Sequence, residues 1–139
     1  MSGKGFKVYI ETMKFNTTGE VDFIDITDKV ADIVRRSGVR NGLAHIFAPH
    51  ATALITLNEY TPDLLKDFKD LLERLAPKKG VYDHPVNAHS HLRSMLINPS
   101  RTVPIVDGRL FLGTWQSIIF IEADTHPRNR TVVVQVIGE

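Results

Sequence analysis

Residues 102–137 read TVPIVDGRLFLGTWQSIIFIEADTHPRNRTVVVQVI. They contain four apolar runs rich in β-branched residues, and short polar segments separate these runs. Asp107-Gly108 stands between the first two runs, 102–106 and 109–113, and this dipeptide is typical of a two-residue β-hairpin turn. Residues 117–123 and 131–137 follow as further candidate strands. Because strands joined by short turns pair antiparallel, this stretch predicts a largely antiparallel or mixed sheet.

The sequence upstream alternates between further strand patterns and helical patterns. β-Branched and aromatic residues indicate strands at 7–18, 23–26, 42–48 and 53–57. Apolar residues at helical spacing indicate helices after the caps Thr27 or Asp28 and Thr61, and a third helix at 88–97. Strands outnumber helices, so we expect a single α+β domain over residues 1–139, with two or three helices, rather than a doubly wound α/β fold. Residues 1–5 are expected to be disordered.

Composition and charge exclude several classes of function. The chain has 139 residues and a formal net charge of +1, from 17 Lys and Arg against 16 Asp and Glu. This balance lacks the basic face that duplex nucleic acid requires. The absence of cysteine excludes disulfides, thiolate nucleophiles and cysteine-based metal sites. No apolar run reaches the length of a membrane span. We therefore expect a cytoplasmic protein without a nucleic-acid or membrane partner.

The six histidines are placed where a metal site is possible. His84, His89 and His91 lie in a polar loop and the helix that it enters, and His50 and His126 border predicted strands. Neutral imidazole is the commonest protein ligand of zinc and similar cations. On a helix, His89 and His91 are about 200° apart, so only one of them points into a given site. Scattered histidines are also common as surface or hydrogen-bonded core residues, and the pattern alone leaves both interpretations open.

Three further polar groups stand near the ends of predicted strands. Asn58-Glu59 directly follows one strand, where an amide and a carboxylate suit general-base work or cation binding. Residues 113–116, Gly-Thr-Trp-Gln, include the only tryptophan and place Gln116 before the next strand. The third group combines carboxylates with arginines: Glu122, Asp124, Arg128 and Arg130. Arginines beside carboxylates can grip a phosphate with paired hydrogen bonds, and an exposed ion-pair cluster is the alternative.

Ordered sequence blocks resemble the YjbQ family. Residues 50–59, HATALITLNE, are similar to its HTTAxLTxNE signature, and residues 87–92, NAHSHL, resemble its NxHSHL element. Residues 103–116 resemble VPxxxGxLxLGTWQ, and the resemblance extends over residues 5–139. The chain is therefore identified as a member of this family. The family's usual glycine after the short helix is Asn98 here, a residue that tolerates a left-handed backbone.

The resemblance implies a fold, an assembly and an activity. It implies a YjbQ-like α+β domain that forms a homotrimer with clefts near the subunit boundaries. It also implies a secondary thiamine-phosphate synthase activity, which joins a hydroxymethylpyrimidine diphosphate to a thiazole phosphate and releases pyrophosphate. Family members suggest a metal held by histidines, and the matching positions here are His50 and His91, with His84 third. His89 is less regular in the family, which favours His91 of the two helical histidines.

These expectations combine into a metal-assisted enzyme that acts on small phosphorylated metabolites. His50, His84 and His91 would hold a divalent ion, with zinc favoured by imidazole ligands and magnesium possible for a diphosphate substrate. The other catalytic candidates are Asn58 and Gln116 to orient substrate, Glu59 or Glu122 to move protons, and Arg128 or Arg130 to neutralise phosphate. The alternatives are a metal-dependent hydrolase at the same site, a non-enzymatic trimer that binds a metal or metabolite, and a structural trimer.

Overall fold

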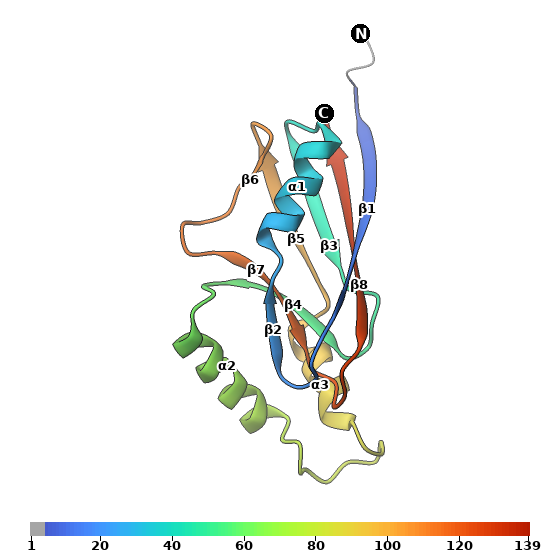
Figure 1. Cartoon of the computed structure of the whole chain (residues 1–139), viewed down its shortest axis with the longest axis vertical. Coiled ribbons are helices and arrows are strands. Elements are labelled where there is room, and N and C mark those ends of the chain that lie inside the picture. Colours follow the sequence, from blue (N-terminus) through green and yellow to red (C-terminus); the bar gives the residue numbers. More distant parts are fainter. Residues whose placement is uncertain (1–4) are drawn as a thin grey trace.

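The computed structural model describes residues 5–139 of the chain. The prediction that residues 1–5 are disordered concerns mainly residues 1–4, which lie outside the described part. Within the described part, strands and helices follow in this order (Figure 1): β1 (Lys7–Asn16), β2 (Asp22–Asp25), α1 (Thr27–Ser37), β3 (Gly42–Phe47), β4 (Ala53–Asn58), α2 (Pro62–Leu75), α3 (Ala88–Ile97), β5 (Ser100–Val106), β6 (Arg109–Leu110), β7 (Ser117–Glu122) and β8 (Asn129–Gly138).

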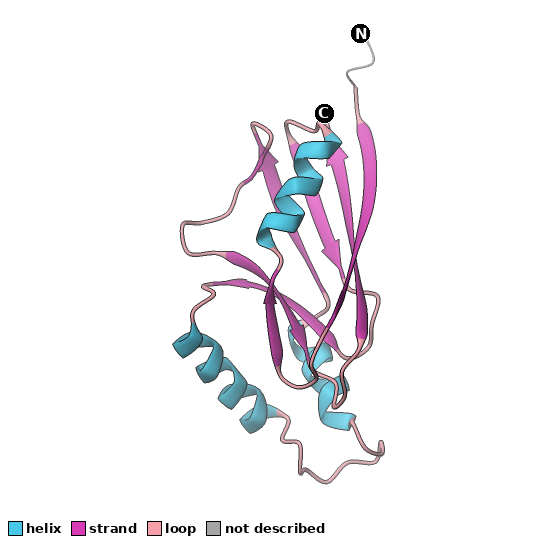
Figure 2. Cartoon of the chain, in the orientation of Figure 1, coloured by secondary structure: helices cyan, strands magenta, loops and turns pink. Residues whose placement is uncertain are grey.

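The strands form two sheets in which every pair is antiparallel. One sheet has five strands in the order β1-β8-β3-β5-β6, and the other has three strands in the order β2-β7-β4. Helix α1 lies beside the five-stranded sheet, and α2 and α3 lie at the opposite end of the molecule (Figure 2). None of the described helices is long and apolar enough to cross a membrane. The predicted α+β class, with antiparallel sheets and three helices in the described residues, is confirmed.

Two apolar clusters hold the layers together. The larger one lies between the five-stranded sheet, α1 and one face of the three-stranded sheet, where Ile46, Val134 and Phe120 are fully buried. The smaller one lies on the other face of the three-stranded sheet and includes Leu54 and Leu72. Alternate residues along β4 and β7 enter opposite clusters because successive side chains of a strand point to opposite faces. The three-stranded sheet is therefore the middle layer of the fold.

The hairpin predicted at Asp107-Gly108 is present, but its second strand is shorter than expected. Asp107 and Gly108 both have positive φ, 53° and 80°, as this turn requires. The predicted strand at 109–113 ends at Leu110. The Phe111 N–H donates to the Pro104 carbonyl at 2.8 Å, but proline has no N–H to return the bond. The ladder therefore stops at Pro104.

The helix ends differ in detail from the sequence expectations. Neither Thr27 nor Asp28 caps α1; instead the Asp25 Oδ1 accepts from the Thr27 N–H at 3.0 Å and from the Thr27 hydroxyl at 2.5 Å. Thr61 does stand at the cap position of α2, followed by Pro62. Asn98 ends α3 with φ 79° and ψ 150°, so its φ is positive as expected, but its ψ lies outside the left-handed helical region.

Candidate functional site

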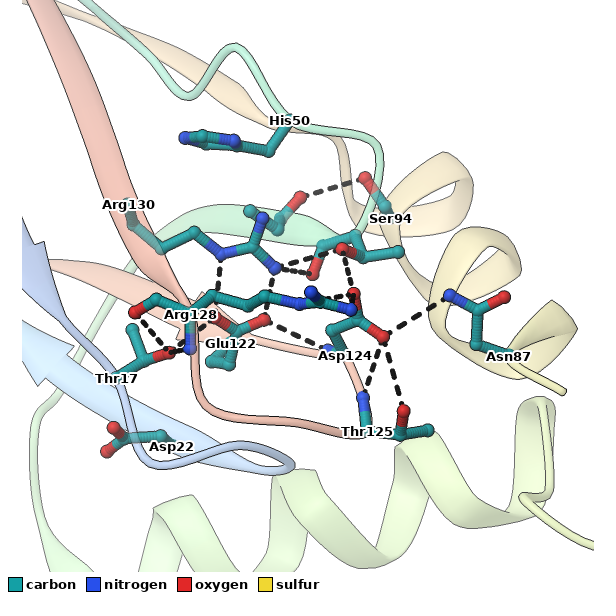
Figure 3. Close-up of polar contacts among 12 residues, drawn as sticks. Thr17, Asp22, His50, Asn87, Ser94, Glu122, Asp124, Thr125, Arg128 and Arg130 are labelled. Atoms are coloured by element: carbon teal, nitrogen blue, oxygen red, sulfur yellow. Dashed lines mark hydrogen bonds and ion pairs between the residues drawn. The ribbon is translucent and has the colours of Figure 1, made fainter.

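A buried ion pair lies between the two sheets at the end of β7. Glu122, the last residue of β7, is fully buried, and Arg130 of β8 is almost as buried. The Arg130 Nε donates to Glu122 Oε1 at 2.6 Å, and its Nη2 contacts the other carboxylate oxygen and Thr52 Oγ1. The Thr17 hydroxyl also donates to Glu122 Oε1, at 2.6 Å. The two charges therefore compensate each other, and the hydrogen bonds of Arg130 use its Nε and Nη2 atoms but not Nη1 (Figure 3).

Asp124 forms a second polar centre two residues beyond Glu122. Its carboxylate accepts from the Thr125 N–H at 2.7 Å, from the Asn87 amide at 3.2 Å and from the Arg128 guanidinium at 3.1 Å. Burial alone would raise the pKa of Asp124, but these hydrogen bonds and the Arg128 charge outweigh it and lower the pKa to about 2. Asp124 thus ties α3, through Asn87, to the segment that precedes β8. The predicted ion-pair cluster is present. Its Glu122–Arg130 pair is buried, whereas the alternative interpretation placed the cluster in solvent.

His50 lies over Arg130 at the same end of the sheet (Figure 3). Its Nε2 stands 3.0 Å from the Thr131 backbone nitrogen and 3.1 Å from the Thr131 carbonyl oxygen. Burial and the nearby Arg130 charge lower the pKa of His50 below its ordinary value, so the ring is neutral at pH 7. The Thr131 N–H donates to Nε2, so Nε2 accepts and the proton of the neutral ring lies on Nδ1. A metal ion at Nδ1 would require the other tautomer and the loss of this hydrogen bond.

His84 and His91 lie together at the start of α3. Their ring centroids are 4.8 Å apart in an edge-to-face arrangement. Both line a cavity of about 390 Å³ with Tyr82 and Met95. His91 also lines a neighbouring cavity of about 280 Å³, together with His50. The structure therefore places His91 between His50 and His84, beside two adjoining hollows.

The histidines at these hollows are donors of the kind that zinc accepts, and the 4.8 Å between the His84 and His91 rings is also the spacing of an ordinary edge-to-face contact. Two imidazoles on one tetrahedral zinc, with Zn–N bonds of ~2.1 Å, hold their ring centres about 5 Å apart, close to the 4.8 Å between the His84 and His91 rings. Among residues 5–139, no three His, Cys, Asp or Glu side chains already stand at the spacing of a metal site. Binding by all three histidines thus requires His50 to move toward the His84–His91 pair.

His89 points away from this group. It is 1% exposed, and its Nε2 lies 3.1 Å from Glu20 Oε2 in the interior. His91 is partly exposed and faces the cavities. The helix thus separates the two histidines as its geometry requires, and only His91 lies beside His84. Helical periodicity alone left this choice open, and the family resemblance favoured His91.

Asn58, Glu59 and Gln116 lie at the other end of the three-stranded sheet. Asn58 pairs with Ser117 there, whereas Ala53 pairs with Glu122 beside the ion pair. Five residue steps along β4 span roughly 16 Å at about 3.3 Å per residue. Gln116 is occupied by its own loop, because its Oε1 accepts from the Gly113 N–H at 2.8 Å. Within one chain, the predicted catalytic residues therefore lie in two groups, one at each end of the three-stranded sheet.

Sequence reasoning missed Thr17, Thr52 and Asn87 as parts of the polar end. Each lies far along the chain from the carboxylate that it contacts, and each has an ordinary turn or cap position in the sequence. The NxHSHL resemblance included Asn87 but gave it no role. The only signal that could have found them is their proximity in the folded chain.

Comparisons with known proteins agree with the fold. A family model described as "UPF0047 protein YjbQ-like" matches residues 11–139. A UPF0047 protein of Methanothermobacter thermautotrophicus is 41% identical, covering 99% of this chain and 97% of the relative. The UPF0047 protein YugU of Bacillus subtilis is 36% identical over 93% of this chain and 99% of the relative. A crystal structure of a YbjQ-like protein of unknown function from Sulfolobus solfataricus has a TM-score of 0.93 and 34% identity, and covers 96% of this chain and 99% of that one.

Proposed function

Because the chain belongs to the YjbQ family, we propose that it is a metal-assisted enzyme that acts on small phosphorylated metabolites. One observation carries the proposal: His84 and His91 lie with ring centroids 4.8 Å apart beside hollows that His91 shares with His50. Three imidazoles from separate segments are a ligand set that suits zinc. The hollows beside them leave room for a small substrate.

Each residue at this end has a distinct part in the proposal. His50, His84 and His91 hold the ion, which when bound polarises a phosphoryl oxygen or activates water. The Arg128 side chain is 44% exposed. Its guanidinium donates to Asp124 and has further N–H groups that can donate to a phosphate. Glu122 and Arg130 are buried against each other, and in this proposal they do not touch substrate. Burial and the Arg130 charge lower the pKa of the neighbouring His50. Asn58, Glu59 and Gln116 are left out of this catalytic set because they lie at the far end of β4.

The reaction that we propose is the pyrophosphate-releasing transfer of thiamine-phosphate synthesis, as a secondary activity. Its support is the similarity of residues 50–59, 87–92 and 103–116 to the family blocks. Hydrolysis of a phosphorylated compound would use the same ion and the same arginine. A diphosphate group favours Mg²⁺, whereas the histidines favour zinc, so both ions belong in the assay. We place the protein in the cytoplasm, where phosphorylated metabolites of this kind are retained.

Replacing His91 by alanine is expected to remove metal binding. His91 borders both hollows, so its loss separates the remaining two histidines. We expect the purified wild type to bind about one zinc ion per chain and His91→Ala to bind less than a tenth as much, measured by elemental analysis after equilibration with zinc. His126→Ala is the matched control, because His126 is exposed in a loop and lines neither hollow.

Two results would contradict the proposal. Equal zinc content in the wild type and His91→Ala would exclude the histidine site. Full turnover by metal-free wild type, assayed with a hydroxymethylpyrimidine diphosphate and a thiazole phosphate, would exclude a metal-assisted reaction. Turnover that appears only after zinc or magnesium is returned would support it and identify the ion.

We also propose that the chain assembles as a homotrimer through the outer face of the five-stranded sheet. Val8 and Ile10 of β1 are 56% and 57% exposed, and Leu43 and Phe47 of β3 are also exposed. Val8 and Leu43 both pair with Ile137 of β8, so the exposed apolar side chains lie in neighbouring rows on one face. In the next row Ile10 and His45 both pair with Gln135, so this face mixes apolar and polar side chains, as the interfaces of assembled proteins do.

Replacing Ile10 by lysine is expected to break this assembly. A lysine at Ile10 would bring a charge into the contact between subunits, where it has no partner and must be desolvated. Light scattering on a sizing column should show the wild type at three times the chain mass and Ile10→Lys at 15.6 kDa. Leu75→Lys is the matched control, since Leu75 is equally exposed on α2, away from the sheet face. A monomeric wild type, or a trimeric Ile10→Lys, would contradict the proposal.

A further inference from the structure

An apolar cavity lies under the first half of α2, at the end of the three-stranded sheet opposite the histidines. Its volume is about 100 Å³. Helix α2 is fully buried only at Leu72, near its last turn. Leu64, Leu65 and Phe68, which precede Leu72, line the cavity, and Leu65 and Phe68 are only partly buried against the sheet. The helix therefore packs tightly at its C-terminal end and leaves a hollow toward its N-terminal end.

The floor of this α2 cavity is built from one face of the middle sheet. Phe23 of β2 and Ile121 of β7 are cross-strand partners, and Thr56 of β4 pairs with Ile119 in the adjoining row. The loop between β4 and α2 is fixed over this floor, because the Tyr60 hydroxyl donates to the Phe23 carbonyl at 2.8 Å. The cavity thus has a rigid sheet on one side and leucine and phenylalanine side chains of a helix on the other.

Polar groups line the cavity where β4 ends. Asn58 and Glu59 both contribute to its wall. The Asn58 Oδ1 accepts from the Glu59 N–H at 2.8 Å, which orients the backbone that carries the Glu59 side chain. A carboxylate beside an otherwise apolar wall accepts hydrogen bonds strongly but offers none at pH 7. The ligand that complements it has an apolar body and an N–H donor at one edge.

We propose that the α2 cavity is a binding site for a small aromatic amine, a single ring that bears one amino group. The ring would lie between Phe23 and Phe68, where aromatic contacts add to burial, and the amino group would donate to Glu59. Apolar cavities of about 150 Å³ take up benzene, and this one is smaller, at about 100 Å³. A single ring is therefore the largest ligand, and it enters when the partly exposed Leu64 side chain at the rim moves outward. The site uses none of the three histidines and does not depend on the proposed metal.

Aniline and toluene are suitable probes, because they have similar shapes and differ in the N–H donor. Binding to the full chain can be followed by two-dimensional NMR, with Kd taken from the shifts of the residues that line the cavity. We expect aniline to saturate these shifts with a Kd in the millimolar range, as the small number of atoms allows, and to bind about tenfold more tightly than toluene.

Two variants test the two parts of the proposal. Leu65→Phe adds volume inside the cavity and should weaken aniline at least about tenfold; Leu64→Phe, at a more exposed lining position, serves the same purpose if Leu65→Phe does not fold. Glu59→Gln keeps the shape and removes the charge, so the preference for aniline over toluene should fall about fivefold. Asp70→Asn, the same exchange on the exposed face of α2, should bind both probes like the wild type.

Three outcomes would overturn the inference. They are shifts that do not saturate or that map away from the cavity, unchanged aniline affinity in both filling variants, and equal affinity for aniline and toluene in the wild type. Measurements with metal-free protein and with His91→Ala separate this site from the proposed enzyme. Aniline binding that survives in both supports the cavity whatever the result at the histidines.

Discussion

Arg130→Met is expected to destabilise the fold by about 3–5 kcal/mol, because it leaves the Glu122 carboxylate buried and unpaired. Glu122 is fully buried, and Arg130 provides its counter-charge through two nitrogens. The carboxylate keeps the Thr17 hydroxyl at 2.6 Å and the Asp124 N–H at 3.0 Å, and neither of these donors carries the positive charge of a guanidinium. Urea unfolding at pH 7, followed by circular dichroism, measures the loss as a lower midpoint at unchanged slope.

A double variant distinguishes an unpaired charge from lost packing. In Arg130→Met/Glu122→Leu both charges are absent and similar volumes remain, so most of the stability should return. Arg128→Met is the matched control for the arginine exchange, since the Arg128 side chain is 44% exposed and its loss should cost about 1 kcal/mol or less. An Arg130→Met protein as stable as the wild type would contradict the buried ion pair. A double variant no better than Arg130→Met would contradict charge as the cause.

Asp124→Asn is expected to cost about 2–3 kcal/mol at pH 7 and to flatten the acid side of the stability profile. The folded-state pKa of Asp124 is lowered to about 2 from an ordinary value of 3.8. A carboxyl whose folded pKa is depressed stabilises the fold fully above its unfolded pKa and loses that contribution as the pH falls through the folded value. The Asp124 contribution should therefore disappear between about pH 4 and pH 2.

Urea unfolding at a series of pH values from 2.5 to 7 measures this dependence. The wild type should lose stability more steeply below pH 4 than Asp124→Asn does, because the variant has no proton to bind at this position. Asp67→Asn is the matched control: Asp67 is exposed on α2, so its profile should follow that of the wild type. Parallel profiles for the wild type and Asp124→Asn would show that Asp124 has no depressed pKa in the folded state.

The sequence predicted which residue types form the candidate site, but not which of them lie together in the folded chain. His50, Asp124, Arg128 and Arg130 were each recognisable from strand ends and charge pairs. Their grouping was not, because it depends on antiparallel pairing that brings Ala53 beside Glu122. The same pairing sends Asn58 to the far end of β4, although it follows His50 by only eight positions. Residues at the two ends of a strand are as far apart as the strand is long, so neighbours within residues 50–59 can belong to different sites.

Local chemistry decided the elements that depend on neighbours in sequence. Asp107-Gly108 determined the hairpin, and Pro62 and Gly38 determined where α2 begins and α1 ends. The nearly continuous apolar runs of β4 and β7 match a sheet that is buried on both faces. These features follow from backbone sterics and from a side-chain period of two, and both act over a few residues. The α+β class and the family blocks were therefore readable from the sequence alone.

Only the tertiary structure decided which polar groups are free to act. Arg130 and Arg128 look alike in sequence, but Arg130 is buried against Glu122, while Arg128 remains partly in solvent. His89 and His91 differ by two positions, and the packing of α3 buries one and leaves the other beside His84. Burial is a property of the assembled layers, because the side chains that exclude water from a charge come from strands far apart in the chain.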